Sequence, residues 1–197
     1  MEPILELAAD SRIAESKFRH CYLHPEDHNR IIKIIVHPDE LSRRLDGNMK
    51  EWKYYQRLKA MKLPLDFIPP YYGFIDTNLG RGLVSQCVRD FDGQVSPRLA
   101  KVLDQREVYN LAEVENKIKE LSGILIKYNI QLFDLNRFNI LVKTLENGSC
   151  QPMLIDLKGP YNNYEFIPVS TYLPYFSRKK LRRRCQRLLD MIIEARS

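Results

Sequence analysis

The early part of the chain has the apolar pattern of a β-sheet. Residues 11–36 predict a strand, a turn and a second strand, and residues 71–88 predict a hairpin that turns at 78–82. Alternate positions of the run 31–36 lie on opposite faces of a strand, and both sets are mainly apolar. Lys33 lies within this run, so we expect it to point toward a covered surface and to need an anionic partner. The alternative is an edge-strand lysine that extends to water.

Helical spacing predicts a helix over 48–61, introduced by Gly47 and ended before Pro64. One stripe of this helix is apolar except for its first residue, and it consists of Glu51, Tyr54, Tyr55, Leu58 and Met61. Glu51 therefore lies on the covered face, where a carboxylate is costly unless it is paired. We expect an ion pair between Lys33 and Glu51; the alternative is that each charge is neutralised elsewhere.

Two later stretches also have helical spacing, at about 108–128 and from about 178 onward. The inward stripe of the first consists of Leu111, Val114, Ile118, Leu121 and Leu125. The inward stripe of the second consists of Leu181, Cys185, Leu188, Leu189 and Ile192, and we expect its basic residues to face outward. Strands early and helices late predict an α+β protein.

The stretch from Leu132 to Gly159 contains the candidate chemistry. Two short apolar runs flank an Asn-Gly turn, a pattern typical of a hairpin. This hairpin would hold Asn139 at its entrance and Asp156 at its exit, where their hard oxygen atoms suit Mg²⁺. Asp134, just upstream, is placed to accept a proton from a hydroxyl. The alternative is a plain hairpin with an aspartate capping a turn.

Composition describes an ordinary globular protein. The chain has 197 residues, of which 44% are hydrophobic and 28% are charged. No apolar run approaches a membrane span, and the N-terminal residues are acidic where a signal peptide would be basic. The four cysteines are scattered without a C-x-x-C pair, so we expect reduced thiols and a cytoplasmic protein.

Positive charge is concentrated in one segment. Residues 178–187 carry seven positive charges and no negative charge, whereas the net charge of the whole chain is +6. The rest of the chain is therefore slightly acidic, which argues against a domain-wide nucleic-acid surface. The basic helix either is a solvated face or binds an anionic partner, which would be acidic protein, nucleic acid or anionic lipid.

The order of these features resembles the protein-kinase-like superfamily, with D-L-x-x-x-N from Asp134 to Asn139 and the metal aspartate Asp156 before Gly159. The resemblance implies a two-lobed fold with a five-stranded antiparallel upper lobe, one helix, and a reduced, mostly helical lower lobe. We place the lobes at 1–92 and 93–197. It also implies ATP and Mg²⁺ as cofactors.

The resemblance assigns roles to further residues. Lys33 would hold the phosphates of ATP and be positioned by Glu51, Asp134 would be the base, and Asn139 with Asp156 would bind Mg²⁺.

The expected nucleotide contacts depart from the superfamily pattern. The phosphate loop would contain Ser16 and Lys17 but has no glycine, and Gln86 and Val88 would form the hinge that contacts adenine. Asn136 occupies the place of a phosphate-contacting lysine, for which Arg137 would compensate.

The segments FRHCYLHPED, KEWKYYQRL and DFDG are similar to those of the PhoP regulatory network protein YrbL family. This resemblance covers nearly the whole chain and implies a bacterial cytoplasmic protein. Two functions remain open. One is an ATP-dependent phosphotransferase acting on a hydroxyl of a small molecule or polysaccharide, with a regulatory role. The other is a pseudokinase that binds nucleotide or a partner protein without catalysis.

Overall fold

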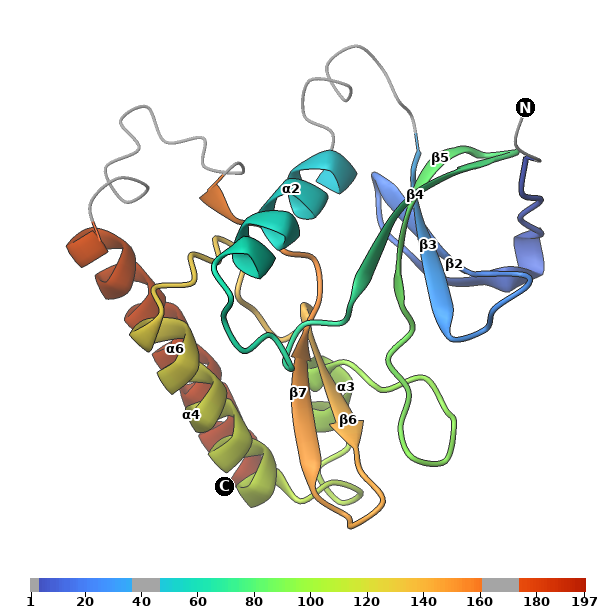
Figure 1. The fold of residues 1–197 in the computed structure, drawn as a ribbon. Helices are drawn as coiled ribbons and strands as arrows, with labels where there is room; N and C mark the ends of the chain where they lie inside the picture. Colours follow the sequence, from blue (N-terminus) through green and yellow to red (C-terminus); the bar gives the residue numbers. More distant parts are fainter. Residues whose placement is uncertain (1–3, 37–46, 161–173) are drawn as a thin grey trace. The chain divides into compact units, whose positions relative to one another are not determined.

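The computed structural model describes residues 4–36, 47–160 and 174–197 (Figure 1). Contacts divide the chain into two compact units. Unit 1 consists of Met1–Gln56 with Pro69–Cys87, and unit 2 consists of Arg57–Ile68 with Val88–Ser197. The division into lobes at residue 92 stays a prediction, and each unit is described by itself below.

Unit 1 is built on a five-stranded antiparallel sheet with the strand order β1-β2-β3-β5-β4. The strands are β1 (Arg12–Glu15), β2 (Arg19–Leu23), β3 (Arg30–Ile35), β4 (Tyr71–Thr77) and β5 (Gly80–Gln86), after a 3-10 turn at Ala9–Ser11. The predicted sheet is confirmed, but residues 11–36 form three strands instead of two. Ser16 closes an additional tight turn, because its backbone N–H donates to the carbonyl oxygen of Arg19 at 2.8 Å.

The two faces of β3 have different neighbours, as its alternating pattern predicts. Ile32 and Ile34 enter the buried cluster on one face, which also contains Leu7, Tyr22 and Val84. Lys33 lies on the other face and is 4% exposed. The β4–β5 turn is tighter than predicted, since β5 already begins at Gly80.

Helix α2 (Gly47–Ala60) contacts the sheet residues of unit 1 through aromatic rings. The rings of Tyr55 and Tyr71 are 4.8 Å apart, and Trp52 meets Phe74 edge-on at 6.2 Å. Glu51, Tyr54 and Tyr55 are buried as predicted. Met61 is 48% exposed, so its placement in the inward stripe is wrong; the helix ends one residue before it.

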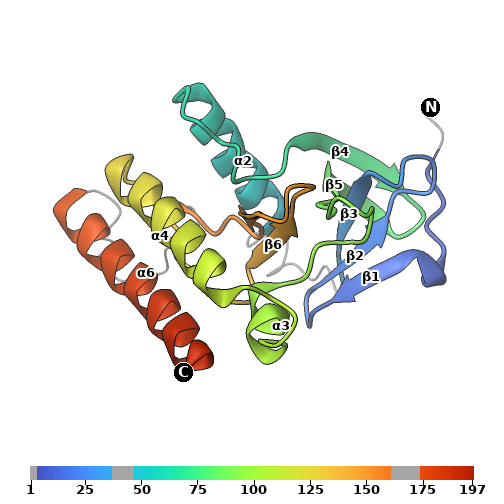
Figure 2. The same ribbon diagram turned by 90° about the horizontal axis from the view of Figure 1, so that it is seen from below.

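Unit 2 contains three helices among its described residues besides the end of α2, and one hairpin. These are α3 (Leu99–Asp104), α4 (Leu111–Lys127), α6 (Pro174–Arg196) and the strands β6 (Ile140–Thr144) and β7 (Cys150–Leu154). Helices α4 and α6 run side by side in opposite directions (Figures 1 and 2). All five residues of the predicted α4 stripe are buried, and Asn110 caps the helix by accepting from the Glu113 N–H.

Two helices of unit 2 differ from the prediction. Helix α3 was not expected, because six residues are too short for helical periodicity to distinguish them from a loop. Helix α6 begins at Pro174 instead of about 178. The irregular segment expected over 160–175 lies almost entirely outside the described residues. No helix in the described ranges is both long and apolar enough to span a membrane.

Candidate functional site

The predicted pairing of Lys33 with Glu51 is confirmed within unit 1. The Lys33 ammonium lies 2.6 Å from one carboxylate oxygen of Glu51, and both side chains are buried. Strand β3 supplies the lysine and the second turn of α2 supplies the glutamate. The side-chain amide of Asn48, one turn before Glu51, donates to the Lys33 carbonyl at 2.7 Å and so joins the helix to the strand.

Two further groups complete this cluster, and neither was predicted. Arg19 on β2 places its guanidinium 2.6 Å from the second carboxylate oxygen of Glu51. The hydroxyl of Tyr71 donates to the first carboxylate oxygen of Glu51, which is the one that Lys33 contacts. Burial raises the pKa of Glu51, but the charges of Lys33 and Arg19, with hydrogen bonds from Lys33 and Tyr71, lower that pKa to about 2. Glu51 is therefore a fixed anion that orients the lysine.

The other predicted residues of unit 1 and of the hinge make turn, backbone or ring contacts within the protein. Ser16 forms the β1–β2 turn with its hydroxyl 3.0 Å from the Arg19 carbonyl, and the Lys17 ammonium lies over the ring of Phe18. Gln86 ends β5, where its N–H donates to the Pro70 carbonyl. Val88, the first residue of unit 2 after β5, is 6% exposed. Their nucleotide contacts stay predictions.

In unit 2 the hairpin brings the predicted metal ligands together at its base. Ile140 pairs with Leu154, and the N–H of Ile155 donates to the Asn139 carbonyl at 3.0 Å. The segments before and after the hairpin are also paired, because the N–H of Phe133 donates to the Lys158 carbonyl at 2.7 Å. The segments that carry Asp134 and Asp156 are thus held next to each other by backbone hydrogen bonds.

The three predicted residues of this site line one small, partly open cavity. Its walls consist of Leu132, Asp134, Leu135, Asn139, Leu154, Ile155, Asp156 and Lys158. The Asn139 side-chain amide donates to the Asp134 carbonyl at 2.9 Å, which leaves its oxygen atom as the group available to a cation. Asn139 and Asp156 therefore offer an amide oxygen and a carboxylate to the same cavity.

This donor set fits Mg²⁺ better than a metal that needs a full protein cage. Within the described part of the chain, no three histidine, cysteine, aspartate or glutamate side chains gather as metal ligands. Mg²⁺ usually keeps several waters and takes one or two protein carboxylates together with substrate phosphates. Asn139 and Asp156 would hold such an ion.

Asp156 has a left-handed backbone, with φ 57°. The other described non-glycine residues with positive φ, Lys62 and Asn129, directly follow helices, where this conformation is common. Asp156 follows a strand instead, and residues in this sparsely populated region are often found at functional sites. Its backbone is held because its carbonyl accepts from the N–H of Lys158 at 2.7 Å.

Asp134 is oriented by its neighbours. Asn136 donates to its carboxylate at 2.6 Å and accepts from the N–H of Phe138. The residue at the position where a phosphate-contacting lysine was expected therefore orients Asp134 instead. Burial raises the pKa of Asp134, but hydrogen bonding and charge from Lys158, with hydrogen bonds from Asn136 and Asn139, lower that pKa overall. Arg137, which we expected to compensate for Asn136, lies over the ring of Phe138 at 5.1 Å.

Lys158 contacts both carboxylates of the cavity and was not predicted. Its ammonium lies 2.5 Å from Asp134 and 3.4 Å from Asp156. Its position two residues after Asp156 makes it a candidate for the same cavity from the sequence alone. Arg19 could not have been found in this way, since its place beside Glu51 depends on the sheet register.

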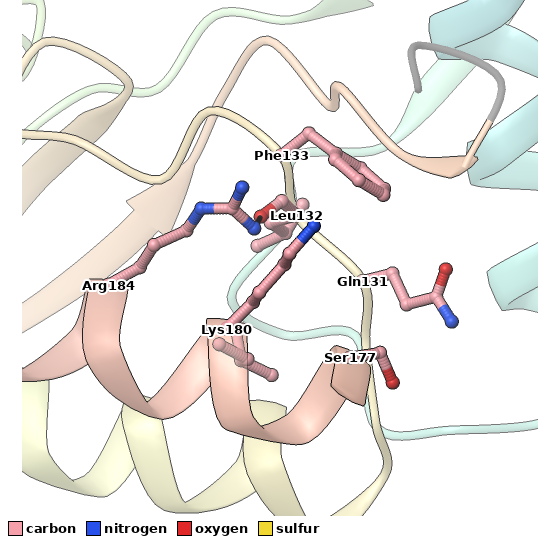
Figure 3. A pocket seen from close by; sticks show the side chains of 7 residues that line it. Gln131, Leu132, Phe133, Ser177, Lys180 and Arg184 are labelled. Atoms are coloured by element: carbon pink, nitrogen blue, oxygen red, sulfur yellow. Dashed lines mark hydrogen bonds between the residues drawn. The ribbon is translucent and has the colours of Figure 1, made fainter. Parts of the chain in front are cut away.

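A second small, partly open cavity lies between α6 and the segment that leads to Asp134 (Figure 3). Arg184 donates to the Leu132 carbonyl at 2.8 Å and lies over the Phe133 ring. Lys180 extends toward the same segment in Figure 3. The expectation that all basic residues of α6 face outward is wrong for these two, which are half-buried because the helix packs against this segment.

Comparison with known proteins gives one consistent result. Residues 5–192 match the family of PhoP regulatory network protein YrbL. The chain is 30% identical over 191 residues to YrbL proteins of Escherichia coli (strain K12) and of Shigella flexneri, covering 94% of this chain and 87% of each relative.

Proposed function

Because this chain belongs to the PhoP regulatory network protein YrbL family, we propose that it and its relatives adopt a reduced protein-kinase-like fold, with ATP-dependent phosphotransferase activity toward a hydroxyl group. The observation that carries the proposal is the shared cavity of Asp134, Asn139 and Asp156 in unit 2. A plain hairpin needs none of the three there, and it does not need Asp156 in a left-handed conformation. The buried Lys33–Glu51 pair in unit 1 adds independent support.

The roles follow from the chemistry of each side chain. Asp134 accepts the proton of the acceptor hydroxyl, and Asn136 keeps its carboxylate oriented. Asn139 and Asp156 hold Mg²⁺, which when bound compensates the charge of the phosphates. Lys33 binds the α- and β-phosphates in the orientation that Glu51 imposes. We assign Ser16, Lys17 and Arg137 to the phosphates, and Gln86 and Val88 to adenine.

We propose that the acceptor is a small molecule or a polysaccharide. We further propose a cytoplasmic place of action, where ATP is available, and a regulatory role in bacteria.

Thermal shift with ATP and MgCl₂ tests the proposal. A ligand that binds only the folded state at 100 times its Kd stabilises it by about 2.7 kcal/mol. We expect Asp156→Asn to abolish the Mg²⁺-dependent shift without strain, because asparagine tolerates a left-handed backbone. Asp104→Asn, an exposed carboxylate in unit 2, is the matched control and should leave the shift unchanged.

Measuring ATP hydrolysis distinguishes the phosphotransferase from the pseudokinase. We expect slow ATP hydrolysis by the wild type that falls roughly 10²–10⁴-fold in Asp134→Asn, the usual range for loss of a general base. A nucleotide-dependent shift without hydrolysis would favour the pseudokinase. No shift with any nucleotide would refute the phosphotransferase and the nucleotide-binding pseudokinase.

A further inference from the structure

Lys158 has a hydrogen-bonded backbone and a partly exposed side chain. Its N–H donates to the Asp156 carbonyl and its own carbonyl accepts from Phe133, both at 2.7 Å. The preceding residue, Leu157, is 1% exposed and anchors the segment in unit 2. The side chain of Lys158 is 42% exposed, so its four-carbon stem has room to turn about this anchor.

The ammonium of Lys158 occupies the oxygen atoms that the proposed reaction needs. It lies 2.5 Å from Oδ2 of Asp134, the proposed base, and 3.4 Å from Oδ2 of Asp156, the proposed metal ligand. While it stays there, a cation on Asp156 meets a second positive charge, and the proton of an acceptor hydroxyl has to compete for Asp134.

These interactions are weak enough to be exchanged. The side chains of Lys158, Asp134 and Asp156 are 42%, 37% and 22% exposed. Ion pairs between partly exposed side chains contribute little net stability, because water competes for both charges. A triphosphate carries several negative charges and can therefore take the ammonium from the carboxylates.

The catalytic loop has no other cation directed at this cavity among its described contacts. Asn136 uses its amide on Asp134, and the guanidinium of Arg137 lies over Phe138, which is 50% exposed. Lys158 is the cation that lines the cavity together with Asp134, Asn139 and Asp156.

We propose that Lys158 is a tethered cation that holds Asp134 and Asp156 in the resting protein and moves to the transferred phosphoryl group when nucleotide binds. The inference rests on the proposed phosphotransferase function. In that reaction the acceptor oxygen forms a bond to the γ-phosphorus and its proton passes to Asp134. The bond from phosphorus to the β,γ-bridging oxygen breaks, and ADP leaves with that electron pair. Lys158 stabilises the charge on the phosphoryl oxygens during the transfer.

The first experiment needs no nucleotide. MgCl₂ is titrated into the wild type, Lys158→Met and Lys158→Arg, and the melting temperature is followed. We expect the half-saturating Mg²⁺ concentration to fall several-fold in Lys158→Met and to stay near the wild-type value in Lys158→Arg. Lys101→Met, an exposed lysine on α3, should behave as the wild type. An unchanged Mg²⁺ dependence in Lys158→Met overturns the resting interaction.

The second experiment measures ATP turnover. We expect kcat to fall roughly 10²–10³-fold in Lys158→Met, as on loss of one donor to transition-state charge, with a small change in KM. Lys158→Arg should recover part of the rate. If Lys158→Met does not fold, Lys158→Gln, which keeps a hydrogen-bond donor, replaces it. A wild type without nucleotide binding or turnover refutes the proposed function and the inference with it. A wild type that turns over ATP, together with an unimpaired Lys158→Met, refutes the inference alone.

Discussion

At the scale of single residues, the buried charges of unit 1 are held by several partners at once. The sequence predicts that Lys33 and Glu51 pair, because each lies on a covered face where an unpaired charge is costly. It does not predict that Arg19 and Tyr71 share the same carboxylate. Those interactions depend on the register Cys21↔Lys33 between β2 and β3, which places Arg19 on the Lys33 face, and a register is set by the folded sheet.

Removing the carboxylate should destabilise the protein strongly. In Glu51→Gln, the charge of Lys33 stays buried without its partner, and loss of one partner of a buried pair typically costs about 3–5 kcal/mol. Lys33→Met should cost less, since Arg19 still compensates Glu51. Urea denaturation measures both, and the double variant Lys33→Met/Glu51→Gln should be more stable than the sum of the two losses indicates. Additive losses would show that the pair is not coupled.

The same carboxylate predicts a pH dependence. The pKa of Glu51 is about 2 in the folded protein against an ordinary value of 4.5, so folding favours its ionised form. Its contribution to stability is therefore complete above pH 4.5 and is lost as the pH falls toward 2. We expect the free energy of unfolding to drop more steeply between pH 5 and pH 3 in the wild type than in Glu51→Gln. Equal slopes would assign the acid sensitivity to other carboxylates.

At the scale of elements, the β6–β7 hairpin and the long helix α4 could be predicted from the sequence. The short helix α3 could not. The β6–β7 hairpin follows from an Asn-Gly turn between apolar runs, and α4 follows from a five-residue apolar stripe. Helix α3 has no such periodicity, yet it helps to hold the segment between Asp134 and Asn139, since the Ala100 N–H donates to the Arg137 carbonyl at 3.0 Å. Long-range hydrogen bonds of this kind leave no local pattern in the sequence.

Substitution of Gly82 on β5 would test how closely the sheet is packed. A Cβ atom added there would lie 2.8 Å from Ile34 Cδ1 and closer still to Ile32 Cγ2, and the β-branched Ile32 has little freedom to move. We expect Gly82→Ala to destabilise the protein by about 1–3 kcal/mol, the usual cost of overpacking. Chemical denaturation measures the change.

Gly123 provides the matched control for this substitution. It lies on an exposed position of α4 with nothing within 4 Å of an added Cβ. We expect Gly123→Ala to stabilise the protein by about 1 kcal/mol, because alanine favours the helix over glycine. A Gly82→Ala variant as stable as the wild type would show that the close approach of β5 to Ile32 is relaxed in solution.

At the scale of the whole molecule, the distribution of charge separates two kinds of basic residue on α6. Lys180 and Arg184 are half-buried and contribute to the cavity beside Leu132 and Phe133. The remaining five, which are Arg178, Lys179, Arg182, Arg183 and Arg187, are exposed. The sequence alone predicts a uniform basic face, because helical spacing does not show which polar positions a neighbouring segment covers. Only the exposed five are candidates for an anionic partner.

We propose that this exposed face binds an anionic partner, with a solvated face as the alternative. The test is the triple charge reversal of Lys179, Arg182 and Arg183 to glutamate, which spares Arg184 and its hydrogen bond to the Leu132 carbonyl. Reversal of the exposed Lys59, Lys62 and Lys101 changes the net charge equally and is the control. We expect the α6 variant to keep the wild-type melting temperature within a few degrees.

Binding is measured with an oligonucleotide, with vesicles containing anionic lipid and with an acidic peptide, each at several salt concentrations. If the face binds nucleic acid, the affinity should fall steeply with salt, and the slope of log K against log salt should become shallower by about 0.9 for each duplex phosphate that the variant no longer neutralises. Binding to only one probe, abolished in the α6 variant and kept in the control, would identify the partner class. Equal weakening in both variants would show that net charge alone is responsible, and no binding to any probe would leave α6 as a solvated face.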